Sequence, residues 1–173
     1  MEKRWKIKPS ADEAILKKLS SELGIDTITA NLLAQRGITT FEEAKKFFRP
    51  SLKDLHDPFL MKDMDKAMER IEKAFQTKEK ILVYGDYDVD GTTSVALVYS
   101  FLKKMFTQFI GANAKEYIDY YIPDRYTEGY GISFQGIDYA VTHNFSLIIA
   151  LDCGIKSIDK IDYANERNID FII

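Results

Sequence analysis

Three aspartates at alternate positions are the residues of this sequence best suited to chemistry. Asp86, Asp88 and Asp90 follow the apolar run Ile81–Gly85 and precede a helical stretch. Three ionised carboxylates so close together repel one another unless a cation lies between them. Hard divalent cations prefer oxygen ligands, and parallel sheets place ligands at the carboxyl ends of their strands. The pattern therefore predicts a metal site, although one or two such aspartates are more often a solvated turn with a helix cap.

The residues after the acidic cluster are suited to binding phosphate. Gly91 gives the backbone room to turn, and Thr92, Thr93 and Ser94 can cap the following helix while offering N–H and O–H donors. Three aspartates between an apolar strand and this start of a helix favour a functional site over a solvated turn. Thr92 and Thr93 are therefore candidate substrate-binding residues.

A second acidic strand end follows later in the chain. In the segment Ser146–Gly154, an apolar run leads to Asp152, then to Gly154 and a helix. If the two strands are neighbours in a parallel sheet, Asp152 lies beside the first cluster, and one metal site draws on both strands. The alternative is that Asp152 only caps a helix. The single cysteine, Cys153, is interpreted as a packing residue, because hard oxygen ligands dominate the site.

A loop rich in glycine and aromatics is the candidate substrate contact. It runs from Tyr120 to Ser133, with Arg125 at its centre and Tyr130 near its end. Arginine binds phosphate bidentately and tyrosine stacks on bases, so the loop suits a nucleotide. In the alternative interpretation, Arg125 pairs with Asp124 or Glu128 and the tyrosines cover the sheet edge. The two histidines, His56 and His143, are isolated and are expected to be surface or capping residues.

The elements that must position these residues alternate between short apolar runs and helical stretches. This alternation predicts an α/β fold with a doubly wound, mostly parallel sheet. The expected strands are 81–85, 117–122, a run within 146–154, and 170–173, and the expected helices are 92–109, 133–142 and 157–168.

The first part of the chain is predicted to be helical. Ser10 with Glu13, and Thr40 with Glu43, are spaced as capping boxes, and Phe48–Phe59 contains two prolines that indicate a connector before a helix at 64–75. We expect a helical lead-in over residues 1–62 and an α/β domain over 63–173. Because residue 173 falls within an expected buried strand, we also expect that domain to be truncated.

The composition limits the class of protein. The chain has 173 residues, 46% of them hydrophobic, which is enough for a globular core. Its 24 Lys and Arg against 27 Asp and Glu argue against a histone-like binder but allow a metal-dependent nuclease. A single cysteine and the absence of a long apolar run favour a cytoplasmic protein that does not bind membranes.

These motifs together resemble the DHH phosphoesterases in their RecJ form. The likeness covers nearly the whole chain, and its order and spacing agree with the family. The matching segments are GDYDVDGTTS at 85–94, YIPDRYTEGYG at 121–131, ALDCGI at 150–155 and a helical lead-in over 32–71.

The resemblance implies a nuclease that degrades single-stranded DNA from the 5′ end in recombination and repair, with repair proteins as possible partners. It implies two ions, Mn²⁺ or Mg²⁺, with Asp88, Asp90 and Asp152 as ligands and Asp86 as a ligand or a supporting acid. Arg125 would hold phosphate. The Asp-His-His motif and a later ligand of the family do not occur in these residues, so the chain alone is expected to be inactive.

Three other functions fit the sequence less well. A sibling DHH enzyme would act on oligonucleotides or cyclic dinucleotides, but such enzymes usually lack the helical lead-in. A non-catalytic RecJ-like scaffold would typically have lost the metal acids, and all four remain here. A hydrolase with a single nucleophilic aspartate gains no support from the Tyr121–Gly131 loop.

Overall fold

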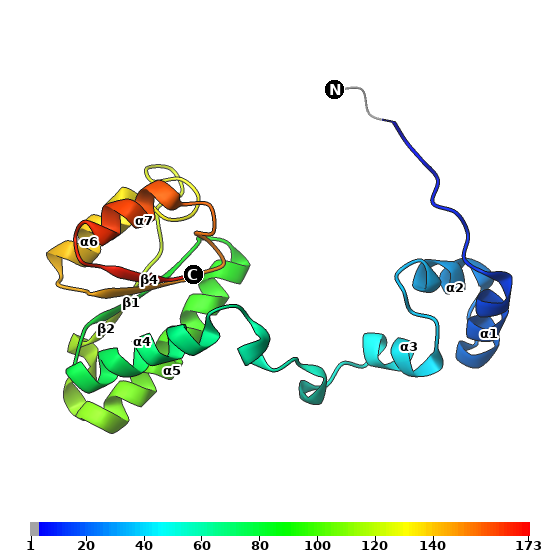
Figure 1. Ribbon diagram of the computed structural model, residues 1–173, viewed down its shortest axis with the longest axis horizontal. Helices are drawn as coiled ribbons and strands as arrows, with labels where there is room; N and C mark the ends of the chain where they lie inside the picture. The colour runs from blue at the N-terminus through cyan, green and yellow to red at the C-terminus, as the bar shows by residue number, and fades with distance from the viewer. Residues whose placement is uncertain (1–3) are drawn as a thin grey trace. The chain divides into compact units, whose positions relative to one another are not determined.

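The computed structural model describes residues 4–173, apart from the side chains of residues 112 and 114. The chain divides into two compact units, Met1–Leu60 and Met61–Ile173, which are described separately. The first is helical, and the second contains the sheet (Figure 1). Within the described residues, no helix is both long and apolar enough to span a bilayer.

The first unit packs α1 (Glu13–Leu23), α2 (Thr27–Ala34) and α3 (Phe41–Phe48) around a small apolar core. The capping box of Thr40 and Glu43 is confirmed at the start of α3. The one expected at Ser10 is wrong, because Asp12 caps α1 by accepting from the Ala14 N–H at 2.8 Å. The Ser10 hydroxyl instead donates to Asn31 of α2. The buried residues of this core are Leu16, Leu19, Ala30, Leu33, Ile38 and Ala44.

The connector contains only the short 3-10 turns η1 (Leu52–Asp54) and η2 (Pro58–Leu60), as its prolines predicted. Beyond it, α4 (Met64–Thr77) leads into the sheet. The described part of the second unit has four parallel strands in the order β2-β1-β3-β4. They are β1 (Ile81–Gly85), β2 (Ile118–Tyr121), β3 (Leu147–Leu151) and β4 (Asp170–Ile172).

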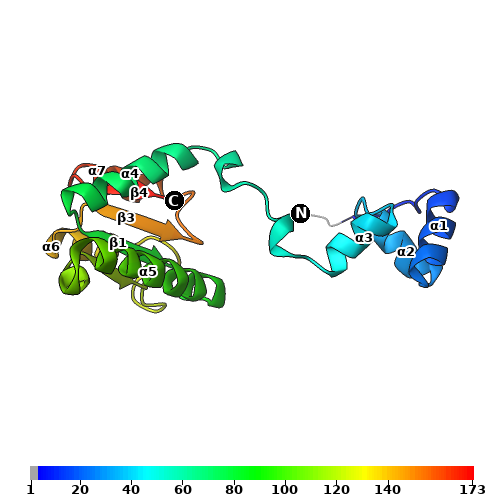
Figure 2. The same ribbon diagram turned by 90° about the horizontal axis from the view of Figure 1, so that it is seen from below.

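Helices cover both faces of this sheet, which confirms the doubly wound α/β fold (Figures 1 and 2). On one face, α4 and α5 (Val89–Ile110) pack through Ala74, Val95 and Phe106 against Val83 and neighbouring strand residues. On the other, α6 (Phe134–Thr142) and α7 (Ile158–Asn165) pack against the alternate side chains of the same strands. The fully buried β1 reads as a continuous apolar run for this reason.

One expected helix boundary is wrong in an informative way. We expected a helix from Thr92, capped by Thr92, Thr93 and Ser94, but α5 begins at Val89. Asp88 caps it instead, accepting from the Gly91 N–H at 2.9 Å. The Thr92 hydroxyl donates back to the Asp88 carbonyl, so it is part of the first helical turn rather than its cap.

A salt-bridged cluster fastens α4 to the amino ends of the strands. Arg70 of α4 donates at 2.6 Å both to Glu79, which precedes β1, and to Asp170, the first residue of β4. The Ser146 hydroxyl, just before β3, also donates to Glu79. These groups come from α4 and from the amino ends of β1, β3 and β4. The cluster therefore fixes α4 to the sheet, at the edge opposite the candidate aspartates.

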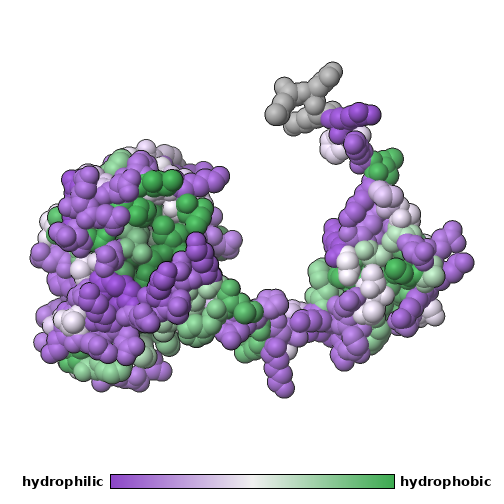
Figure 3. Space-filling view, viewed as in Figure 1, coloured by the Kyte–Doolittle hydropathy of each residue, from purple (hydrophilic) through white to green (hydrophobic). Residues whose placement is uncertain are grey.

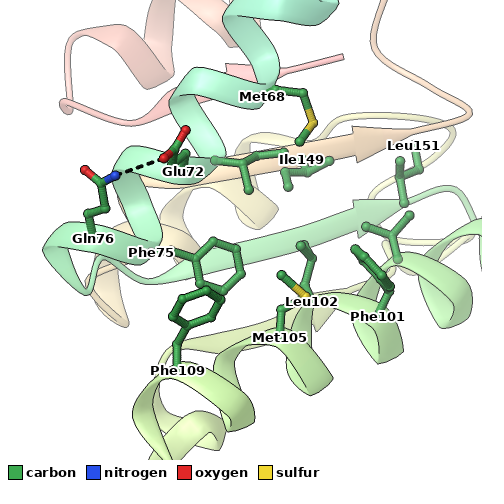
Figure 4. Close-up of a pocket in the computed structure, with 12 residues that line it drawn as sticks. Met68, Glu72, Phe75, Gln76, Phe101, Leu102, Met105, Phe109, Ile149 and Leu151 are labelled. Carbon is green, nitrogen blue, oxygen red and sulfur yellow. Dashed lines mark hydrogen bonds between the residues drawn. The ribbon is translucent and has the colours of Figure 1, made fainter. Parts of the chain in front are cut away.

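Apolar surface remains exposed on the second unit. A groove of about 610 Å³ opens between α4 and α5, and its lining includes Met68, Phe75, Phe101 and Phe109 of the two helices and Ile149 of β3 (Figure 4). A second apolar area lies around β4 and the loop after β3 (Figure 3), where Ile155, Ile158 and Ile173 are exposed. The candidate aspartates do not line the groove between α4 and α5.

Candidate metal and nucleotide site

The two acidic strand ends lie side by side. β1 pairs with β3, and Gly85 is the register partner of Leu151, so Asp86 and Asp152 each follow one member of a paired position. The connection after β1 runs over the α5 face, whereas the connection after β3 runs over the α7 face. Chains that leave neighbouring strands toward opposite faces form a crevice, where α/β folds bind ligands. Asp86 and Asp152 are placed at this point.

Asp86 is fully buried at the base of the crevice. Its Oδ1 accepts from the Gly131 N–H at 3.4 Å, a long hydrogen bond. Its Oδ2 is buried and has no hydrogen-bond partner among residues 4–173. A buried carboxylate oxygen without a partner is costly unless a cation or another donor satisfies it. The environment of Asp86 therefore fits a divalent cation.

Gly91 brings the start of α5 against the backbone of Asp86. A Cβ atom at position 91 would lie 2.4 Å from the Asp86 carbonyl oxygen, so only glycine fits there. The close approach places Asp88 at the helix cap and Asp90 in the first turn, both exposed. Because one oxygen of Asp88 caps the helix, its other oxygen is the one left for a ligand.

Asp152 is exposed and lies in the left-handed backbone region, with φ of 57°. Aspartate tolerates this conformation better than most residues, and it turns the chain sharply at the strand end. The Tyr130 hydroxyl lies 3.5 Å from the Asp152 carbonyl oxygen. Desolvation, followed by the negative charges of Asp86, Asp152 and Asp88, raises the pKa of Tyr130. Tyr130 thus lies within the combined field of these carboxylates.

The carboxylates are nevertheless not gathered into a complete ligand set. Within residues 4–173, no three His, Cys, Asp or Glu side chains are close enough to hold a metal ion together. Asp86 Oδ1 accepts from the Gly131 N–H and Asp88 Oδ1 caps α5, while Asp90 and Asp152 are both exposed. The structure therefore brings two strand ends together without assembling a closed metal centre.

The loop after β2 is folded by its own acids rather than by ion pairs with Arg125. Asp124 accepts from the N–H groups of Tyr126 and Thr127. Glu128 accepts from the Asp124 N–H, so neither acid pairs with Arg125 as the alternative interpretation required. Arg125 makes no ion pair with the described residues, and its guanidinium lies over the Tyr87 ring, 5.4 Å from the centroid.

Sequence reasoning missed the residues beneath this loop. The buried hydroxyl of Tyr84, in β1, donates to the Gly131 carbonyl at 2.9 Å and accepts from the Ser133 N–H at 3.1 Å. Burial raises the pKa of Tyr84 to about 12, so it stays a donor at neutral pH. The sequence did contain one signal for this network, a tyrosine in an otherwise aliphatic strand. A buried tyrosine hydroxyl usually has a hydrogen-bond partner, which predicts a polar contact there.

The other residues singled out in the sequence lie in different environments. Burial, followed by the charges of Asp86 and Asp152, raises the pKa of Cys153 to about 11, and the residue packs against the α6–α7 face. His143 is the C-cap residue of α6, and His56 is exposed in the connector. Thr93 is exposed on the first turns of α5, close in sequence to the capping Asp88.

Comparison with known proteins places the chain in a family. Residues 80–173 match the model of the DHH family, N-terminal domain. This is more than half of the chain, and the chain therefore belongs to the DHH family.

Several of the relatives that it matches are named as RecJ exonucleases, in agreement with the motifs. The chain is 40% identical over 171 residues to the single-stranded-DNA-specific exonuclease RecJ of Bacillus subtilis (strain 168), covering 98% of this chain and 20% of that protein. It is 31% identical over 142 residues to RecJ of Escherichia coli (strain K12), covering 82% of this chain and 22% of that protein. The chain thus spans about a fifth of the length of these curated relatives.

Solved structures agree with the fold. A crystal structure of exonuclease RecJ bound to manganese matches with a TM-score of 0.53 and 26% identity, covering 64% of this chain and 26% of that one. RecJ from Thermus thermophilus, in complex with Mn²⁺, matches with a TM-score of 0.62 over 97% of this chain and 22% of that one. Its identity is 21%, so this second likeness concerns the fold alone.

Proposed function

We propose that this chain is part of a metal-dependent exonuclease that degrades single-stranded DNA from the 5′ end in recombination and repair. The observation that carries the proposal is the buried, unpartnered Oδ2 of Asp86 at the strand end adjoining that of Asp152. The relatives named RecJ support the substrate, and the manganese in their solved structures supports a divalent ion.

Asp88, Asp90 and Asp152 would hold two ions, Mn²⁺ or Mg²⁺, together with Asp86. When bound, two divalent cations would acidify the attacking water and offset charge on the leaving oxygen. Arg125 would bind a phosphate, with its planar guanidinium oriented by the Tyr87 ring. Tyr130 would stack on a base, while Thr92 and Thr93 lie in the amino-terminal turn of α5, where backbone N–H groups attract phosphate.

The 173 residues alone are expected to bind the ions weakly and to cut DNA little or not at all. Metal affinity depends on ligand number and fixed geometry, and the described residues bring no three ligands together. Calorimetric titration of this chain with Mn²⁺ tests the expectation. Tight binding or robust digestion by the chain alone would contradict it.

The activity itself is tested on the gene product that contains these residues. It is incubated with Mn²⁺ and single-stranded DNA labelled at either end, or with dinucleotides. Release of label from the 5′ end of long strands, and its loss in Asp152→Asn, is the expected result. A matched control is Asp138→Asn, on α6, where the carboxylate accepts from the Tyr163 hydroxyl and lies apart from the candidate aspartates in sequence. Preference for dinucleotides would instead favour the sibling DHH activity.

A further inference from the structure

Glu128 joins three separate pieces of the loop over the site. Its Oε1 accepts from the Asp124 N–H at 2.8 Å, and its Oε2 accepts from the Tyr121 hydroxyl at 2.9 Å and from the Ser133 hydroxyl. Tyr121 ends β2 and Ser133 caps α6, so a single carboxylate links a strand, a loop and a helix. In this arrangement all three partners of Glu128 donate, and the two oxygens of its carboxylate accept all three hydrogen bonds.

Ser133 connects Glu128 to the part of the loop that contacts Asp86. Its N–H donates to the Tyr84 hydroxyl, which in turn donates to the Gly131 carbonyl. Gly131 is thereby fixed with its own N–H toward Asp86 Oδ1. The other oxygen of Asp86 is the buried one without a partner. The loop therefore determines which oxygen of Asp86 stays free.

The same contacts leave Arg125 without an ion pair to Glu128. Glu128 lies three residues from Arg125, yet its oxygens are taken by Tyr121, Ser133 and Asp124 rather than by the guanidinium. Arg125 stays on the Tyr87 ring. A carboxylate near an anionic substrate is unfavourable for binding. A role for Glu128 in holding Gly131 and Arg125 in place explains why a carboxylate is present here.

We propose that Glu128 is a positioning residue, which fixes Gly131 against Asp86 and leaves Arg125 free to bind the DNA. This rests on the proposed nuclease function. Loss of a group that orients a metal ligand typically lowers metal affinity or activity by roughly 10- to 100-fold. Glu128→Ala is therefore expected to raise the KM for single-stranded DNA and the half-saturating Mn²⁺ concentration within that range, with a smaller change in kcat.

Two further variants separate positioning from stability. Glu128→Gln keeps the shape and can still accept from the Asp124 N–H while donating to the two hydroxyls, so it is expected to restore most of both constants. Asp138→Ala removes a comparable carboxylate–tyrosine hydrogen bond at Tyr163, away from the loop. It is expected to lower Tm less than Glu128→Ala, because it removes one hydrogen bond rather than three, and to leave both constants unchanged.

Amide hydrogen exchange gives a readout that needs no activity. Glu128→Ala is expected to speed exchange at Gly131 and Ser133, while Asp138→Ala does not. Wild-type exchange rates and a wild-type KM in Glu128→Ala would overturn the positioning role and leave the nuclease function standing. A wild-type gene product that does not digest single-stranded DNA would instead overturn the proposed function.

Discussion

Gly91 lies directly against the backbone of Asp86, with room for a hydrogen atom but not for a methyl group. A Cβ at position 91 would stand 2.4 Å from the Asp86 carbonyl oxygen and 2.8 Å from its nitrogen. These are backbone atoms of a buried strand end, so they cannot move aside as a flexible side chain would. The contact explains why a glycine lies in the first turn of α5 despite its low helix propensity.

Gly91→Ala is therefore expected to destabilise the second unit. Forced overpacking typically costs about 1–3 kcal/mol, and α5 would have to shift away from β1. Urea unfolding at pH 7 measures the change in the free energy of unfolding. Ser100→Ala, at an exposed position on the same helix, is the control and should be nearly neutral. Equal midpoints for the two variants would show that the turn relaxes freely.

Asp88 offers a way to separate helix capping from metal binding. Asparagine caps helices about as well as aspartate, whereas alanine loses about 1 kcal/mol at such a position. Asp88→Asn is expected to keep the Tm of the wild type but to weaken Mn²⁺ binding, because it has lost the charge. Asp88→Ala is expected to lose both. The measurements are thermal unfolding without metal and a Mn²⁺ titration of the gene product. Unchanged Mn²⁺ affinity in Asp88→Asn would exclude this residue as a ligand.

The general plan of the fold could be predicted from the sequence. Apolar runs such as Ile81–Gly85 carry a strong signal because both faces of the sheet are covered, and the two acidic strand ends proved to be neighbours. The helix start at Val89 was not predicted, because Asp88, Thr92 and Ser94 are all residue types that cap helices, and the close contact of Gly91 with Asp86 is a tertiary feature. Local sequence does not show how tightly two segments approach each other.

The polar network under the loop was also beyond prediction. From the sequence, Glu128 is expected only as a partner for Arg125, three positions away. Its actual partners include Tyr121 and Ser133, which come from β2 and the cap of α6. Such contacts depend on how the ends of β2 and α6 are placed around Tyr84, which only the packed structure shows. The roles of the aspartates, Arg125 and Tyr130 remain predictions.

The salt-bridged cluster around Glu79 predicts a pH dependence of stability. Burial opposes ionisation of Glu79, but hydrogen bonds from Ser146, Arg70 and Thr77 outweigh it and hold the pKa of Glu79 below its usual 4.5. A carboxylate with a lower pKa in the folded protein is stabilising above its unfolded pKa, and this stabilisation is lost as pH falls through the folded value.

The wild type is therefore expected to exceed Glu79→Gln in unfolding free energy by a constant amount near pH 7. The difference should begin to shrink as pH falls below about 4.5 and should vanish below the folded pKa. Urea unfolding between pH 7 and pH 3 measures both proteins. If the difference in unfolding free energy does not change with pH, the cluster stabilises the fold through packing rather than through hydrogen bonds to the ionised carboxylate of Glu79.

Substitutions of Arg125 can separate the contribution of the guanidinium shape to phosphate binding from the contribution of its positive charge. Its guanidinium lies over the Tyr87 ring and makes no ion pair with the described residues, so it is available for a phosphate. Lysine keeps the charge but loses the planar fork that stacks on a ring and binds two oxygens at once. Arg125→Lys is therefore expected to raise the KM for single-stranded DNA with little change in kcat, and Arg125→Ala to raise it further.

Steady-state digestion by the gene product at several salt concentrations measures both Arg125 variants, because a lost phosphate contact also lowers the salt dependence of binding. Lys160→Ala, which removes a cation lying over Phe134 on the α6–α7 face, is the matched control and should leave the KM unchanged. Equal KM values for Arg125→Lys and the wild type would mean that charge alone suffices at this position.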